Sequence, residues 1–135
     1  MKENKERVKY WIELADYDLE TAKAMLQGER YLYVGFMCHQ TVEKALKAVM
    51  AQKFLHEDIP PKTHNLIKLA ALAEVHEVLS QSQRDFVARL NPLNIEARYP
   101  SYKQQLLDAL TKDECEKIIS ETEVLLCWIK SRLGK

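Results

Sequence analysis

The stretch from Tyr33 to Phe54, YVGFMCHQTVEKALKAVMAQKF, decides the fold of this chain. Read as a helix at about 100° per residue, it carries apolar side chains on most of its circumference. Val42, Leu46 and Val49 form its broadest apolar face. A helix that is apolar on most sides normally lies at the centre of its bundle. We therefore predict that the other helices pack around this segment.

A polar stripe interrupts the apolar surface of this helix. Gln40, Glu43 and Lys47 follow one another at helical spacing, with Lys44 on the flank. Polar side chains on a central helix must bond to one another inside the protein or face a cleft. The alternative is a solvated stripe, in which an i,i+4 Glu43–Lys47 pair contributes only about 0.2–0.5 kcal/mol. From the helix alone both interpretations stay open.

Length and composition indicate one helical domain over residues 1–135. The chain has only three glycines and four prolines, and residues that favour helices dominate it. Its 20 Lys and Arg balance its 20 Asp and Glu, so no overall field draws it to nucleic acid or anionic lipid. A local basic site is compatible with this balance.

The sequence predicts a cytoplasmic protein that does not bind membranes. No signal peptide is recognisable at the N-terminus, and the longest uncharged run, residues 31–42, is shorter than the roughly 20 residues that span a bilayer. The three cysteines and four histidines have no zinc-ligand spacing, so we expect no metal site and no cofactor. Two of the cysteines fall on apolar helical faces, which is typical of buried free thiols.

Apolar periodicity predicts the remaining elements. Gly28 is expected to end the first helix in a left-handed conformation, Thr63 to cap the third, Ser80 or Ser82 to cap the fourth, and Thr111 with Glu114 to form a capping box. The architecture is an all-α, up-and-down bundle of four main helices plus one or two short helices. The helices are expected at 5–27, 33–56, 64–79, a shorter stretch containing 86–90, 101–110 and 111–133.

Two segments outside the central helix carry functional side chains. His64 lies in the first turn of the third helix, where the macrodipole disfavours protonation. A neutral imidazole there can accept a hydrogen bond, act as a base or bind phosphate, and simple packing over the loop is the alternative. Arg98, between Tyr99 and Tyr102, is suited to phosphate and base recognition. Its alternative is an ion pair with Glu43 or Glu96, while Asp18 on the first helix is expected to face water.

Three segments in this order resemble the HEPN (higher eukaryotes and prokaryotes nucleotide-binding) domain family. They are GFMCHQTVEKALKA at 35–48, THNL at 63–66 and ARYP at 97–100. The resemblance implies a helical bundle that dimerises. Many small prokaryotic members are encoded beside a minimal nucleotidyltransferase as toxin–antitoxin-like pairs. Numerous members are metal-independent ribonucleases, in which four to six residues separate an arginine from a histidine.

Carried over to this chain, Arg98 matches the family's arginine, but Lys103, Gln104 and Gln105 occupy the window of the histidine. We therefore predict a nucleotide- or RNA-binding module that pairs with a minimal nucleotidyltransferase and lacks robust ribonuclease activity. The predicted ligand-binding residues are Gln40, Glu43, Lys44, Lys47, His64, Arg98, Tyr99 and Tyr102.

Two alternatives stay open. One is a metal-independent endoribonuclease that uses Arg98 with His64 as catalytic residues. The other is a purely structural dimeric scaffold. A homodimer is expected in any case, because more apolar side chains are present than one small core needs. Those invoked for the interface are Tyr31, Tyr33, Phe36 and the helix around Phe86.

Overall fold

The computed structural model describes residues 2–54, 63–94 and 100–133, and within these the side chains of 4–54, 63–94 and 104–133. Every regular element in these ranges is helical, which confirms the all-α prediction. The α-helices are α1 (Lys2–Gln27), α2 (Tyr31–Lys53), α3 (Leu66–Leu72), α4 (Gln81–Leu90), α5 (Pro100–Ala109) and α6 (Lys112–Leu133). Two short 3₁₀ helices, η1 (His76–Val78) and η2 (Asn91–Leu93), flank α4.

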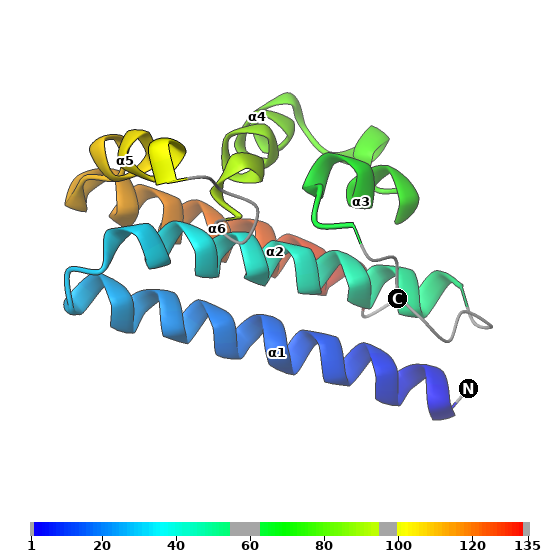
Figure 1. The fold of residues 1–135 in the computed structure, drawn as a ribbon. Helices are drawn as coiled ribbons and strands as arrows, with labels where there is room; N and C mark the ends of the chain where they lie inside the picture. Colours follow the sequence, from blue (N-terminus) through cyan, green and yellow to red (C-terminus); the bar gives the residue numbers. More distant parts are fainter. Residues whose placement is uncertain (1, 55–62, 95–99, 134–135) are drawn as a thin grey trace.

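The long helix α2 occupies the centre of the bundle. It packs against α1 and α6, and the short helices α3, α4 and α5 cover its other side (Figure 1). The tight α1–α2 turn makes these two helices antiparallel neighbours. By contrast α6 runs parallel to α2, since Cys115 contacts the Tyr31 carbonyl at one end and Gln52 donates to the Leu133 carbonyl at the other. The chain between α2 and α6 serves as the crossover.

The core forms around α2, as its apolar circumference predicts. Buried residues recur along its whole length, α1 contributes Ala15, Leu19 and Ala22, and α6 contributes a stripe from Cys115 to Ile129. Cys38 and Cys115 are buried free thiols within this core, and Cys127 is an exposed one. Phe86 is also buried, so its expected part in an exposed interface is wrong, whereas Tyr33 is exposed. Within the described ranges, no helix combines the length and apolarity that crossing a bilayer requires.

The end of α1 differs from the prediction in one residue. Glu29, not Gly28, adopts the left-handed conformation, with a φ of 59°. The Arg30 amide donates to the Met25 carbonyl at 2.8 Å, and the Glu29 amide donates to the Leu26 carbonyl at 3.1 Å. These two bonds form a Schellman motif, whose left-handed position falls one residue beyond the glycine.

The third helix is much shorter than the periodicity predicts. It ends at Leu72, because Glu74 turns the chain into the left-handed region with a φ of 61°. A separate 3₁₀ turn, η1, then continues toward α4. The N-cap is Asn65 rather than Thr63, since its side chain accepts from the Lys68 amide at 3.0 Å. The helix therefore starts two residues after His64 and leaves that imidazole in front of its first turn.

The later helices start at predicted caps, although of the predicted Thr111–Glu114 capping box only the half made by the Thr111 hydroxyl forms. Ser80 caps α4 in a complete capping box, in which Gln83 returns a bond to the Ser80 amide. The hydroxyl of Thr111 accepts from the Glu114 amide at 3.1 Å and so starts α6. Both helices begin where side-chain oxygens satisfy amides that the helix leaves unpaired.

Candidate functional site

A buried carboxylate organises the most distinctive polar group of the molecule. Glu43 is only 2% exposed, although it lies midway along α2. It accepts from the Lys47 ammonium at 2.9 Å and from Nδ1 of His64 at 3.0 Å. These contacts exclude the solvated interpretation of the stripe. The i,i+4 pair of Glu43 and Lys47 is present, but it is buried, and His64 from outside the helix also bonds to Glu43.

The fold brings His64 to α2 through the start of α3. Leu66, two residues later, is fully buried, and its amide donates to the Asn91 side chain at 2.8 Å. That bond ties the first turn of α3 to the end of α4. The Asn65 side chain caps α3 and so restrains the backbone directly after His64. Packing and two capping bonds therefore hold the imidazole against Glu43.

The protonation states in this group follow from its geometry. Burial alone would raise the pKa of Glu43, but the bonds from Lys47 and His64 outweigh it and hold this pKa below its ordinary value. An ionised carboxylate only accepts hydrogen bonds, so Nδ1 of His64 carries the proton. Nε2 of His64 is therefore available to bind a ligand or to accept a proton. Since 47% of the His64 side chain is exposed, this imidazole is accessible.

His39 supports the carboxylate from one turn earlier on α2. Its Nδ1 lies 3.4 Å from the Gln40 side-chain oxygen and 3.7 Å from Oε1 of Glu43. Burial lowers the pKa of His39, although Glu43 and Gln40 act in the opposite direction. This histidine was not among the site residues predicted from the sequence. Its i,i+4 spacing to Glu43 was the available signal.

Lys47 has an aromatic neighbour that the sequence did not indicate. Its ammonium lies 5.4 Å from the centroid of the Trp11 ring, which α1 presents to α2. A cation over an indole face gains a favourable electrostatic interaction. We call Glu43, Lys47, His64, His39 and Gln40 the carboxylate cluster, with Trp11 at its edge.

The structure separates Lys44 from the carboxylate cluster. Its ammonium pairs with the carboxylate of Asp18 on α1. Asp18 is buried, so the expectation that it faces water is wrong. The pair lies at the α1–α2 interface, where it satisfies two charges between packed helices. Its observed contacts favour a structural role.

The remaining predicted site residues are not all within the described part of the chain. Arg98 and Tyr99 lie outside the described residues. Tyr102 belongs to α5, but its side chain is outside the described set as well. The predicted contact between Glu43 and Arg98 therefore stays a prediction. Of the eight predicted residues, the structure brings Gln40, Glu43, Lys47 and His64 together.

Chemically, the carboxylate cluster offers an accessible imidazole that a buried carboxylate orients. This arrangement fixes the tautomer and the orientation of the ring. The same imidazole can donate to phosphate when protonated or accept a proton when neutral. Within the described residues, no group of three or more potential metal ligands is present.

Comparison with known proteins identifies the family. A family model described as HEPN domain matches residues 8–132, which confirms the resemblance. No curated protein matches the sequence. The solved structure of TT1696 from Thermus thermophilus is similar, with a TM-score of 0.74 and 21% identity over 93% of this chain and 97% of that chain. At this identity the similarity shows the fold alone.

Proposed function

The chain belongs to the HEPN domain family, and from this premise we propose that it is a nucleotide- or RNA-binding module without an intact ribonuclease motif. The observation that carries the proposal is the hydrogen bond from Nδ1 of His64 to Glu43. It engages Nδ1 and leaves Nε2 of this half-exposed imidazole available to a ligand, while the Lys47 ammonium bonds to the same carboxylate. A phosphate group matches both, because each can donate a charge-assisted hydrogen bond to it.

We further propose that Arg98 completes this site. As a guanidinium it is suited to hold phosphate in a bidentate way, and an aromatic ring of Tyr99 or Tyr102 is suited to stack on a base. Trp11 is a second candidate for stacking, because it already lies under the Lys47 ammonium. His39 lies 3.7 Å from the Glu43 carboxylate and 3.4 Å from the Gln40 side-chain oxygen, so we propose that His39 positions the carboxylate.

Family resemblance supports two partners for this module. We propose that it forms a homodimer and that it works with a minimal nucleotidyltransferase in a toxin–antitoxin-like pair. The test is copurification of the chain with the product of the neighbouring gene. A stable complex supports the pairing, and a chain that elutes alone at the mass of its monomer contradicts both assignments.

One observation favours a second candidate, a metal-independent endoribonuclease. The Glu43–His64 pair resembles the carboxylate–imidazole pairs that enzymes use as general bases. His64 would then take the proton of a 2′-hydroxyl in place of the missing motif histidine, and Arg98 would stabilise charge on the phosphate. The leading proposal expects binding without cleavage, so activity separates the two.

The deciding experiment uses His64→Asn and Arg98→Ala. Asparagine keeps a donor near the position of Nδ1 but removes Nε2, so Glu43 stays bonded while the proposed phosphate contact is lost. His76→Asn, in η1, is the matched control. Binding of labelled single-stranded RNA and of nucleotides is measured by fluorescence anisotropy, and cleavage is followed on a gel.

We expect wild type and His76→Asn to bind equally and to leave the RNA intact. His64→Asn and Arg98→Ala are each expected to weaken binding about tenfold, the effect of one charge-assisted hydrogen bond. Unchanged binding in both variants would refute the proposed site. Cleavage by wild type that both substitutions abolish would establish the ribonuclease instead.

A further inference from the structure

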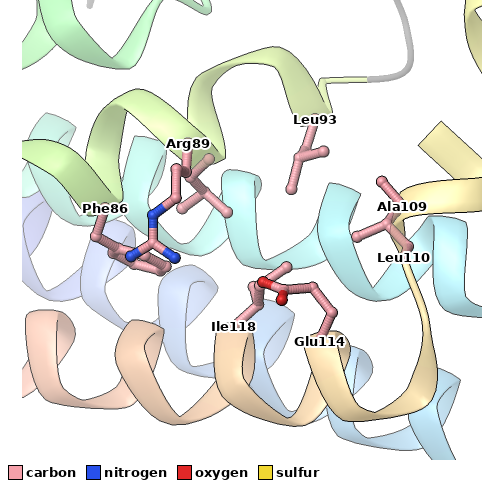
Figure 2. Close-up of a pocket in the computed structure, with 8 residues that line it drawn as sticks. Phe86, Arg89, Leu93, Ala109, Leu110, Glu114 and Ile118 are labelled. Atoms are coloured by element: carbon pink, nitrogen blue, oxygen red, sulfur yellow. The ribbon is translucent and has the colours of Figure 1, made fainter. Parts of the chain in front are cut away.

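A second concave site lies away from the carboxylate cluster, between α4, η2, the end of α5 and the start of α6. It is a pocket of about 280 Å³ (Figure 2). Gly35 of α2 backs it, because the missing side chain lets Leu93 and Leu110 approach α2 closely. Its apolar lining includes Phe86, Leu90, Leu93, Leu110 and Ile118, and its charged residues are Arg89 and Glu114.

Glu114 is the first unusual feature of this pocket. Its amide completes one half of the capping box with Thr111 at 3.1 Å, but its carboxylate does not return the second half. In the part of the chain that the structure describes, this carboxylate has no hydrogen bond or ion pair. The equivalent box of Ser80 and Gln83 has both halves. Figure 2 shows the Glu114 carboxylate pointing into the pocket.

Burial and position make this carboxylate a good acceptor. The Glu114 side chain is half-buried, so it has lost part of its hydration. It lies in the first turn of α6. A partly desolvated carboxylate without a partner is matched by a ligand that brings a cation.

Arg89, whose side chain is 56% exposed, lies on the opposite wall of the pocket. Its guanidinium carbon lies 5.5 Å from the centroid of the Phe86 ring, and one of its nitrogens donates to Glu121 at 2.7 Å. Stacking and this bond restrain the plane of the guanidinium. A guanidinium has five N–H donors, so others stay available for an anion. No ion pair joins Arg89 to Glu114 in the described structure, and the two charges face the pocket separately.

We propose that this pocket binds a free α-amino acid with an apolar side chain, of the size of leucine or phenylalanine. The ammonium group bonds to Glu114, the carboxylate bonds to Arg89, and the side chain fills the space between Phe86 and the leucines. A zwitterion matches this lining, because its ammonium group can pair with Glu114 and its carboxylate can bond to the remaining donors of Arg89. The volume is close to the lower limit of small-molecule sites, about 300 Å³, which suits a single amino acid.

The first test uses the wild-type protein and a series of ligands that share one apolar group. L-leucine is compared with isopentylamine, which lacks the carboxylate, and with 4-methylpentanoate, which lacks the ammonium. Binding is measured by the shifts of pocket amides in heteronuclear NMR. We expect leucine to bind and each analogue to bind at least about tenfold more weakly, because one charge-assisted hydrogen bond is lost.

The second test uses Glu114→Gln, which keeps the shape of the side chain and removes its charge. Glu116→Gln is the matched control, because Glu116 is exposed on the same helix and does not line the pocket. We expect the first variant to weaken leucine binding about tenfold and the control to leave it unchanged. Circular dichroism verifies the fold of both. No amide shifts at the solubility limit of leucine and phenylalanine, or equal binding of leucine and isopentylamine, would overturn the proposal.

Discussion

Replacing Glu43 by alanine tests whether the carboxylate cluster is the buried, bonded group that the structure shows. The substitution removes the acceptor of Lys47 at 2.9 Å and of His64 at 3.0 Å. Breaking a buried ion pair typically costs about 3–5 kcal/mol, because the remaining charge is left without its partner. The Lys47 side chain retains 11% exposure, which lets it recover some hydration. We therefore expect a loss of about 3 kcal/mol, at the lower end of this range.

The assay is urea denaturation at neutral pH, with the free energy of unfolding taken from linear extrapolation. The matched control is Glu13→Ala on α1, whose i,i−4 pair with Lys9 is largely exposed on both sides. Surface pairs of this kind contribute less than about 1 kcal/mol. Glu43→Gln should fall between the two, because it keeps an acceptor for His64 but loses the charge. Equal losses for Glu43→Ala and Glu13→Ala would refute the reasoning.

Three further predictions follow from other parts of the molecule. Burial lowers the pKa of His39 below its ordinary 6.5, so the unfolded chain binds this proton more readily, and stability should fall as pH decreases through 6.5. His39→Gln should flatten that decrease in a denaturation series over pH, whereas His76→Gln should not. Gly35→Ala should leave the free energy of unfolding unchanged or raise it by up to about 1 kcal/mol. Alanine has the higher helix propensity, and the Leu93 and Leu110 side chains can move toward the pocket to make room for its methyl group. A clear loss of stability in urea denaturation would contradict this prediction. Light scattering at micromolar concentration should give the mass of a homodimer, since Tyr33 and other large apolar side chains are exposed, and a monomer mass would contradict it.

The sequence by itself determined the helices whose signals are local. The apolar circumference of residues 33–54 predicted the central position of α2, and apolar periodicity predicted a helix at 111–133, where α6 lies. Thr111 marked the start of α6 correctly, and Ser80, one of two candidates with Ser82, marked that of α4, because a cap bonds to amides only two or three residues away. Such interactions close within one turn, so their spacing along the chain is enough to predict them.

Where local signals compete, the sequence was less reliable. Gly28 and Glu29 are both near the end of α1, and the hydrogen bonds of the Schellman motif placed the left-handed residue at Glu29. The periodicity of 64–79 continues through Glu74, but the chain turns there. Leu66 and Ala70 pack against the core, and α3 ends in a Schellman motif, in which the Val75 amide donates to the Ala70 carbonyl and the Glu74 amide donates to the Ala71 carbonyl. Tertiary packing overrides helix propensity in such cases.

Only the tertiary structure decided what the polar stripe does. Glu43 and Lys47 are one turn apart, so their pairing was predictable, but His64 lies 21 residues from Glu43 and meets it only because α3 packs on α2. In the same way, Lys44 meets Asp18 and Glu114 turns into the pocket because of helices distant in sequence. Helical spacing predicts which side chains share a face. Whether that face is buried, and which partner it meets, depends on contacts between segments far apart in the chain, and these arise only when the helices pack.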